Sequence, residues 1–357
     1  MYRFNTNHLT LTIAPTLKCN FNCVYCYEDG YRYTTMDKET QDAVIKFVKQ
    51  YIANISTLTV MWYGGEPLLA IDTIDYLTQE FLKLCGDKVK YTAAMVTNGY
   101  NLNKDNVNRL KKLKVKRVQI TIDGPKIIHD ERRKLSNGKG SFDKIISNIQ
   151  ESYNELSITI RINIDKDNVS SLNKLLGVFE DAGIKNKVPF YLAPVDKIND
   201  ICYDINCFNS YDFSIEEINF YKIALQRGFY SVPLLHPVLG ICGAVALNSY
   251  VIDPKGNLYK CWNSIGRVEE KVGNIFNGIK FNNNLLKWLL YNPLENNECR
   301  ECNVLPLCMG GCPDHIIQNG TAKCNSIRYN AKEITKLIYE IKKTNKEKSC
   351  DEHYMKV

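Results

Sequence analysis

Three cysteines stand close together near the start of the sequence, at Cys19, Cys23 and Cys26. Three thiolates from one short loop can ligate three irons of a [4Fe–4S] cube and leave the fourth iron without a protein ligand. Zinc is the competing metal, but it prefers four closed ligands, or three with a histidine, and no histidine lies near this loop. The spacing therefore favours an iron–sulfur cluster with one iron open to a substrate or cofactor.

A second group of cysteines lies toward the other end of the sequence, at Cys242, Cys261, Cys299, Cys302, Cys308, Cys312 and Cys324. The chain has 357 residues, 14 cysteines and a net charge of +7, and it shows neither a signal peptide nor an apolar run that could span a membrane. We therefore expect a cytoplasmic protein whose thiols stay reduced, and clustered cysteines then indicate metal rather than disulfides. A zinc ribbon is disfavoured, because seven cysteines without a paired histidine do not divide into closed tetrahedral sites.

Alternating strand-like and helix-like segments occupy the first 195 residues and must position the first loop. The strand signals are Leu9–Ile13, Leu58–Tyr63, Tyr91–Val96, Arg117–Ile122, Ile158–Ile164 and Val188–Ala193. Amphipathic stretches of helical period lie at Asp37–Ala53, Ile71–Leu84, Lys104–Leu113, Phe142–Tyr153 and Val169–Ala182. The alternation predicts an α/β fold, a partial (β/α)6 TIM-like barrel of parallel strands that binds ligands at the carboxyl ends of the strands.

The pattern changes after about residue 197. A helix is predicted at Ile215–Gln226, a β-hairpin at Tyr250–Lys260 and a closing helix at Tyr329–Asn345. We expect a barrel domain over residues 1–199, a linker over 200–232, a small Cys-rich iron–sulfur domain over 233–330, and a helix and tail over 331–357. The length suffices for the two domains to have a core each.

Short motifs accompany the predicted strands in a fixed order. Gly64-Gly65-Glu66-Pro67 ends the second strand, Thr97-Asn98-Gly99 the third, and Thr121-Ile122-Asp123-Gly124-Pro125 the fourth, while Arg161-Ile162-Asn163 lies in the fifth. Together with the Cys-x₃-Cys-x₂-Cys loop and Tyr25 before its last cysteine, these pieces make residues 8–195 resemble the radical S-adenosylmethionine superfamily. Any one piece alone would be weak; their order makes the resemblance specific.

The resemblance implies that the open iron chelates S-adenosylmethionine, whose C5′–S bond is cleaved reductively to give a 5′-deoxyadenosyl radical. Tyr25 is then expected near adenine, Thr121 at the ribose and Arg161 at the methionine carboxylate. The flexible backbone of Gly64 and Gly65 would approach the methionine amino group, and the remaining expected contacts are Glu66, Asn98 and Asn163. Structural alternatives exist: the glycines as a turn, Tyr25 as a core aromatic, and Arg161 in an ion pair.

The cysteines of the C-terminal region resemble the seven-cysteine SPASM extension of radical enzymes. The resemblance implies a fully ligated [4Fe–4S] cluster on Cys299, Cys302, Cys308 and Cys324. It implies another cluster, nearer the substrate, on Cys242, Cys261 and Cys312, and so three [4Fe–4S] clusters in all. Some relatives have a fourth cysteine six residues before the first, where this chain has His236. Either His236 completes the cluster or its fourth iron is open, and we favour the open iron.

Enzymes with this extension usually modify ribosomal peptides, so the resemblance implies a peptide maturase that crosslinks, epimerises, oxidises or forms a thioether. Sulfatase-maturating relatives have a catalytic aspartate directly after the second cysteine of the extension. Here that residue is Trp262, which disfavours sulfatase maturation. The alternative is a radical dehydrogenase of a small molecule, whose extension is typically shorter. A non-enzymatic iron–sulfur carrier would not need the Gly64 and Arg161 motifs.

Partners follow from the same resemblance. We expect a reduced flavodoxin or ferredoxin as electron donor, and the basic surface favours an acidic partner. Cys19 leaves no room before the barrel for a leader-recognition domain, so a leader would bind the barrel, a separate leader-binding protein, or nothing. The basic residues are too dispersed for a nucleic-acid site. Four cysteines remain outside the clusters and are expected to be incidental: Cys85, Cys202, Cys207 and Cys350.

Overall fold

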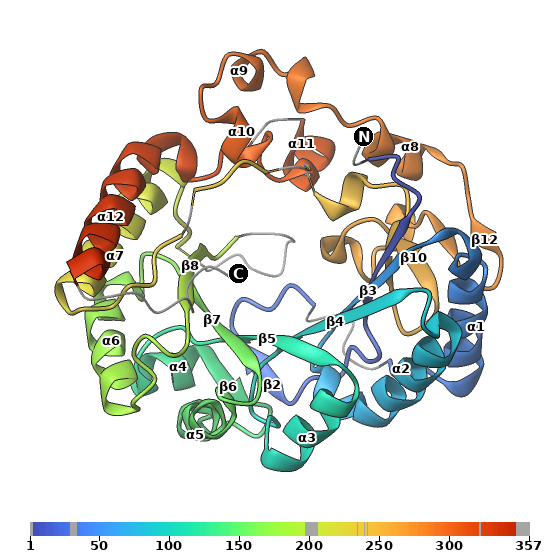
Figure 1. The fold of residues 1–357 in the computed structure, drawn as a ribbon, viewed down its shortest axis with the longest axis horizontal. Helices are drawn as coiled ribbons and strands as arrows, with labels where there is room; N and C mark the ends of the chain where they lie inside the picture. The colour runs from blue at the N-terminus through green and yellow to red at the C-terminus, as the bar shows by residue number, and fades with distance from the viewer. Residues whose placement is uncertain are drawn as a thin grey trace.

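Six parallel strands form the centre of the molecule (Figure 1). The computed structural model describes residues 3–28, 34–196, 206–233, 235–238, 240, 242–320 and 323–347. The six strands are β1 (His8–Ile13), β3 (Thr57–Trp62), β4 (Lys90–Thr97), β5 (Val115–Thr121), β7 (Ser157–Ile164) and β8 (Phe190–Pro194). They are hydrogen-bonded in that order, each parallel to the next. The prediction of an α/β fold with a partial barrel is confirmed.

Helices cover the outer face of these strands (Figure 1). They are α1 (Lys38–Lys49), α2 (Ile71–Cys85), α3 (Lys104–Lys112), α5 (Phe142–Ser152) and α6 (Leu172–Asp181). Side chains that are wholly buried on alternate positions of β1, such as Leu9 and Leu11, belong to the main core. The side chain of Asp37 caps α1 by accepting a hydrogen bond from the Thr40 N–H at 2.8 Å.

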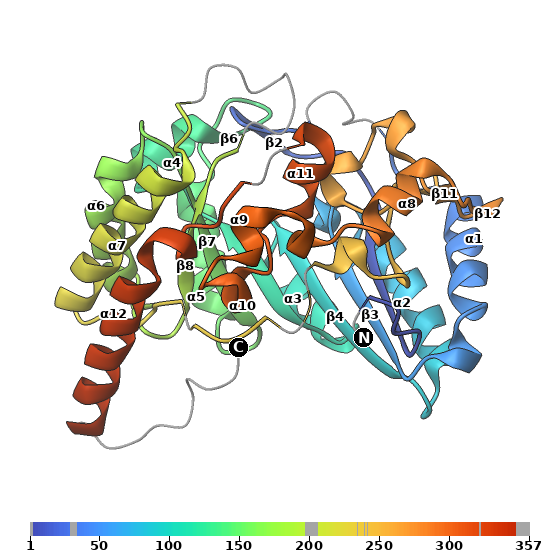
Figure 2. The ribbon, with the colours of Figure 1, turned by 90° about the horizontal axis from the view of Figure 1, so that it is seen from above.

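A short helix and two short strands were not predicted from the sequence. Helix α4 (Lys126–Arg132) leads into β6 (Arg133–Leu135), which pairs antiparallel with β2 (Phe21–Cys23). Strand β2 belongs to the first cysteine loop, and Cys23 is the direct partner of Arg133 in the register. The two strands lie together at one edge of the barrel (Figure 2). The loop is therefore fixed to the segment that follows β5.

The Cys-rich region continues the barrel sheet. Strand β9 (Ser249–Ile252) pairs parallel with β1 and antiparallel with β10 (Asn257–Tyr259), which confirms the predicted hairpin. Strands β11 (Gly273–Asn274) and β12 (Gly278–Ile279) extend the sheet to ten strands. The main core also crosses this border, since it includes side chains of both β1 and β9, and a smaller cluster of four buried residues includes Trp288. The two regions thus share a core instead of having only separate ones.

Short helices and two longer ones complete the fold. They are α7 (Ser210–Gln226), α8 (Asn283–Leu289), α9 (Asn297–Arg300), α10 (Leu305–Cys308), α11 (Pro313–Asn319) and α12 (Ile327–Glu347), besides 3₁₀ turns at Ile52–Asn54, Pro67–Ala70, Val169–Ser171, Gly243–Val245, Trp262–Ser264, Val268–Glu270 and Pro293–Glu295. Helices α7 and α12 pack side by side (Figure 1). Helix α7 begins five residues before the predicted start at Ile215, because Asn209 caps it through the Asp212 N–H. Within the described residues, no helix is both long and apolar enough to cross a membrane.

Candidate active site

The first cysteine loop follows β1, and its three cysteines are half-buried. The pKa of the Cys19 thiol is raised to about 12, first by burial and then by the negative charges of Glu66, Cys23 and Cys26. The Phe21 N–H opposes this trend by donating a hydrogen bond to the Cys19 sulfur at 3.4 Å. Three thiolates can therefore share this loop only beside a compensating positive charge, such as that of iron.

Gly64 and Gly65 lie directly against the segment that leads into the cysteine loop. Gly64 has a φ of +113°, and a Cβ there would lie 2.4 Å from the Thr16 carbonyl oxygen. A Cβ on Gly65 would lie 2.5 Å from the carbonyl oxygens of Leu17 and Lys18. The room that glycine provides is thus filled by the chain's own backbone. Gly64 and Gly65 thus form a turn, as the structural alternative expects, and this turn also positions the cysteine loop.

Glu66 is completely buried, and its carboxylate is hydrogen-bonded to other groups of the protein. Its oxygens accept hydrogen bonds from the Thr97 hydroxyl at 2.7 Å, the Asn98 N–H at 2.7 Å and the Leu68 N–H at 3.0 Å. Burial raises the pKa of the carboxyl, and these hydrogen bonds oppose the rise. Glu66 therefore joins the carboxyl ends of β3 and β4. The Asn98 amide continues the chain of contacts, since it donates to Asn20 Oδ1 at 2.8 Å within the cysteine loop.

Tyr25 is held by its hydroxyl at the carboxyl ends of β5 and β7. The hydroxyl donates to Asp123 Oδ2 at 2.6 Å and accepts from Arg133 Nη1 at 2.8 Å and Asn163 Nδ2 at 3.1 Å. Asp123 is wholly buried, and its Oδ1 has no hydrogen-bond partner among the described residues. Burial raises the pKa of both Tyr25 and Asp123. The network fixes the aromatic ring between two cluster cysteines.

Thr121 and Arg161 are partners in the β5–β7 register at the carboxyl end of the sheet. Thr121 is buried, and the Arg161 Nε donates to Asn163 Oδ1 at 2.7 Å. The guanidinium carbon lies 5.9 Å from the Tyr191 ring centroid. Arg161 forms no ion pair among the described residues, so the structural alternative of a salt bridge is not seen there. The predicted positions on β5 and β7 are thus neighbours.

Two buried carboxylates beside this network were not singled out from the sequence as a pair. Arg132 donates from Nε to Asp123 at 3.3 Å and from Nη2 to Asp165 at 2.6 Å. Both carboxylates are wholly buried, and the Arg132 side chain is 12% exposed. Arg132 comes from α4, which the sequence pattern did not reveal. Its pairing brings α4 to the carboxylates that follow β5 and β7, so only the tertiary structure could identify it.

Cys299, Cys302, Cys308 and Cys324 line one small cavity. Burial raises the pKa of the Cys299 thiol, and the charges of the other three raise it further. Arg328 reaches the same group, because its Nη1 donates to the Cys324 sulfur at 3.0 Å. The structure therefore gathers the four cysteines that were predicted to share a cluster.

Cys242, Cys261 and Cys312 form a second group. Burial raises the pKa of each thiol. The negative charge of Asp314 raises the pKa of all three thiols further, and that of Cys242 also raises the pKa of Cys261 and Cys312. His236, the predicted minor candidate for a fourth ligand, is exposed.

Trp262 stacks on Tyr63 between the first and second groups of cysteines. The two rings are nearly parallel, at 14°, with centroids 5.4 Å apart, and Trp262 is 44% exposed. Tyr63 follows β3 and its hydroxyl contacts that of Tyr27, which comes directly after Cys26. The position after Cys261, where a catalytic aspartate would indicate sulfatase maturation, is thus occupied by an indole, which has no acidic group.

The remaining cysteines are not gathered with these groups. Cys85 is buried at the end of α2, as a small hydrophobe would be, and Cys207 is half-buried. Cys202 and Cys350 lie outside the described residues. In the described part of the chain, no three His, Cys, Asp or Glu side chains converge as the ligands of a single metal ion do. A cube of four irons spreads its thiolates more widely, so this finding does not test the cluster hypothesis.

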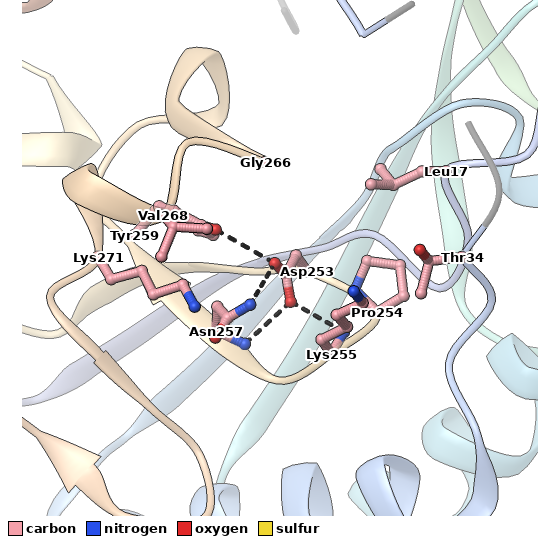
Figure 3. Close-up of a pocket in the computed structure, with 10 residues that line it drawn as sticks. All are labelled: Leu17, Thr34, Asp253, Pro254, Lys255, Asn257, Tyr259, Gly266, Val268 and Lys271. Atoms are coloured by element: carbon pink, nitrogen blue, oxygen red, sulfur yellow. Dashed lines mark hydrogen bonds between the residues drawn. The ribbon is translucent and has the colours of Figure 1, made fainter. Parts of the chain in front are cut away.

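A cavity of about 280 Å³ lies apart from the cysteines, beside the turn between β9 and β10 (Figure 3). The buried Asp253 carboxylate points into the turn and accepts hydrogen bonds from the Lys255 N–H, from the N–H and amide of Asn257, and from the Tyr259 hydroxyl. These contacts satisfy the carboxylate and hold the hairpin. We assign this cavity a structural role.

Known proteins match the chain in sequence. The model described as the Radical SAM superfamily matches residues 13–176. The cysteine-type anaerobic sulfatase-maturating enzyme of Clostridium novyi is 26% identical, over 94% of this chain and 97% of its own. The radical SAM cyclopropyl synthase TigE of Paramaledivibacter caminithermalis is 22% identical, over 85% of this chain and 67% of its own.

Solved structures share the fold. The enzyme anSMEcpe with bound AdoMet and Cp18Cys peptide has a TM-score of 0.71 at 19% identity, covering 96% of this chain and 100% of its own. Streptococcus suis SuiB bound to S-adenosylmethionine has a TM-score of 0.64 at 16% identity, covering 91% and 77%. The predicted resemblance to the radical SAM superfamily is confirmed over residues 13–176, and the similarity of fold extends over the Cys-rich region.

Proposed function

We propose that this protein is a radical S-adenosylmethionine enzyme that modifies a peptide, with three [4Fe–4S] clusters. The observation that carries the proposal is the gathering of ten cysteines into three groups inside one continuous fold. A cluster on the first group, when bound, supplies the electron that cleaves S-adenosylmethionine to a 5′-deoxyadenosyl radical. The buried thiols, whose charges oppose one another, fit a group that brings positive charge.

The residues at the carboxyl ends of the strands are proposed to hold S-adenosylmethionine. Arg161 is oriented by Asn163 and would pair with the methionine carboxylate. Thr121, its neighbour in the register, would face the ribose. Glu66 would act indirectly, because its carboxylate is already used in positioning Asn98 and the glycine turn. Tyr25 would present its ring to adenine while Asp123 holds its hydroxyl.

A peptide substrate is favoured over a small molecule by the complete seven-cysteine set. The full-length likeness to a sulfatase-maturating enzyme also supports a maturase. Within this class we disfavour sulfatase maturation, because Trp262 cannot take a proton as the expected aspartate would. The exposed indole, held flat by Tyr63, instead offers a wall against which a substrate side chain can pack.

Iron content and 5′-deoxyadenosine release test the core of the proposal. After anaerobic reconstitution we expect about twelve irons per chain, from three four-iron clusters, and 5′-deoxyadenosine upon addition of dithionite and S-adenosylmethionine. Replacing Cys19, Cys23 and Cys26 by alanine should remove about four irons and abolish 5′-deoxyadenosine. Cys85→Ala, a matched control outside the groups, should change neither. Release of 5′-deoxyadenosine from the triple variant would contradict the mechanism.

Sulfatase maturation remains the second candidate, because of the 26% identity over nearly the whole of both chains. The discriminating substrate is the Cp18Cys peptide that is bound to anSMEcpe in the solved structure. We expect no loss of the thiol from this peptide, as judged by mass spectrometry. Conversion of its cysteine to formylglycine would establish the second candidate and show that a base other than residue 262 serves.

Partners and location belong to the same proposal. A flavodoxin or ferredoxin would supply electrons, and the net charge of +7 suits an acidic donor. A separate leader-binding protein would present the peptide if the barrel does not bind its leader. We propose a cytoplasmic location, where the clusters are protected from oxygen and the thiols stay reduced.

A further inference from the structure

Asp314 is a buried carboxylate that the mechanism described so far does not use. It lies in the first turn of α11, two residues after Cys312, and is 8% exposed. Its Oδ1 is buried and has no hydrogen-bond partner among the described residues. A buried charged oxygen without a donor is costly, so such an atom calls for an explanation, and an ion beside it is one.

Two sets of hydrogen bonds hold Asp314 between two cysteines of the second group. The backbone N–H groups of Asp314 and His315 donate to the Cys312 sulfur. On the other side, the Asn263 N–H donates to the Cys261 sulfur, and the Asn263 side-chain amide donates to Asp314 Oδ2 at 3.0 Å. One oxygen is therefore fixed by Asn263, and the charge of the carboxylate acts on all three thiols. Metal-bound carboxylates are commonly oriented in this way by a hydrogen bond to the second oxygen.

Among the described residues, no cation forms an ion pair with the Asp314 carboxylate. Lys260 is the buried ammonium that influences this group, and it donates to the carbonyl oxygens of Ala246 at 2.5 Å and Ser249 at 2.6 Å. His236 is exposed, as are Cys242 and Cys312, so the choice between His236 and Asp314 falls to the variants described below.

We propose that Asp314 is the fourth protein ligand of the cluster on Cys242, Cys261 and Cys312, bound through Oδ1. The inference rests on the proposed function, since it requires that these three cysteines hold a [4Fe–4S] cluster. It replaces both of the earlier alternatives, the open iron and His236. The carboxylate is a harder ligand than a thiolate, so the iron that it binds would differ in its donor set from the three irons held by cysteine.

The test uses the full chain with Cys19, Cys23 and Cys26 replaced by alanine, which removes the first open iron. We expect about eight irons per chain, from two four-iron clusters. About four irons or fewer would overturn the second cluster, and the inference with it. With eight irons, the reduced protein is mixed with ¹³C-cyanide and examined by electron–nuclear double resonance. We expect no ¹³C coupling while Asp314 is present.

Variants of residue 314 then decide the ligand. Asp314→Ala should open the iron, so that a ¹³C coupling appears; Asp314→Asn, which keeps the shape and the Asn263 contact, is the second variant if the alanine chain misfolds. Asp314→Cys should keep eight irons without a coupling, and so should the control His236→Ala. If Asp314→Ala loses the cluster, eight irons in Asp314→Cys would still support ligation by residue 314. Loss of the cluster from Asp314→Cys as well would overturn the proposal. Three other results would overturn the proposal that Asp314 is the ligand. They are a ¹³C coupling in the parent, a coupling that only His236→Ala gains, and the absence of a coupling in an Asp314→Ala chain that keeps eight irons.

Discussion

His129 provides the sharpest test of the electrostatics inside the barrel. Its Nδ1 accepts the Asp123 N–H at 3.3 Å, and its Nε2 lies 3.2 Å from the Ser141 hydroxyl, which donates to the Arg133 carbonyl at 2.7 Å. The proton therefore belongs on Nε2, and a second proton on Nδ1 would break the bond to Asp123. Burial lowers the pKa of His129 to about 3, and Arg133 adds to the effect.

The size of the pH effect follows from linkage. In the unfolded chain a histidine titrates near 6.5, so lowering the pH protonates the unfolded state while folded His129 stays neutral. The pKa is depressed on folding, so stability is fully present above pH 6.5 and is lost as the pH falls toward 3. Between pH 7.5 and pH 5 the loss is about 2 kcal/mol. Asp130 opposes the shift, whereas Arg132 and Lys126 support it.

Urea unfolding of the iron-free, reduced chain at pH 7.5 and pH 5 measures this loss. His129→Gln removes the titrating ring, and its amide can still accept from Asp123 and donate to Ser141. Its stability should therefore fall by about 2 kcal/mol less than that of the wild type between the two pH values. The control His8→Gln, at an exposed position, should behave as the wild type does. Equal losses in His129→Gln and the wild type would refute a neutral buried histidine.

Three further predictions concern the packing of the site. Gly64→Ala should destabilise the fold by about 1–3 kcal/mol and lower the iron content of the first loop, because of its positive φ and the nearby carbonyl oxygen. The control Gly177→Ala lies on a helix with room for a methyl group. It should keep its iron and show no loss of unfolding free energy in a urea titration. Arg132→Gln should cost about 3–5 kcal/mol, since buried Asp165 loses its ion-pair partner and buried Asp123 keeps only the charge of Arg133. Lys126→Gln, at exposed ion pairs, should cost about 0–1 kcal/mol. Cys299→Ala should lose about four irons yet retain 5′-deoxyadenosine release; unchanged iron would remove Cys299 from the ligand set.

Local sequence patterns were enough to predict the barrel, because the strands alternate with amphipathic helices. The grouping of the C-terminal cysteines was predicted from the resemblance to the SPASM extension, since Cys242, Cys261 and Cys312 are far apart in the sequence. The glycine pair was also found by its pattern, although its close contacts are with Thr16 and Leu17 of the chain itself.

Contacts between distant segments could not be predicted in the same way. The pairing of Cys23 with Arg133 joins two strands of three residues each, which are too short to show a period. Asp314 has an ordinary helix-start position in the sequence, and only its burial beside Cys261 sets it apart. Both features depend on how elements cross in space.

The parallel pairing of β1 with β9 has a consequence for the order in which the clusters can form. Thr10 and Ser249 are partners, although all the other barrel strands lie between them in the sequence. Closing so long a loop is slow and gains little until the intervening strands have folded. Cys261 follows this hairpin, whereas Cys299 to Cys324 lie close together in the chain. During maturation, the four-cysteine site should therefore be ready for iron early, and the site that contains Cys261 only when the barrel is complete.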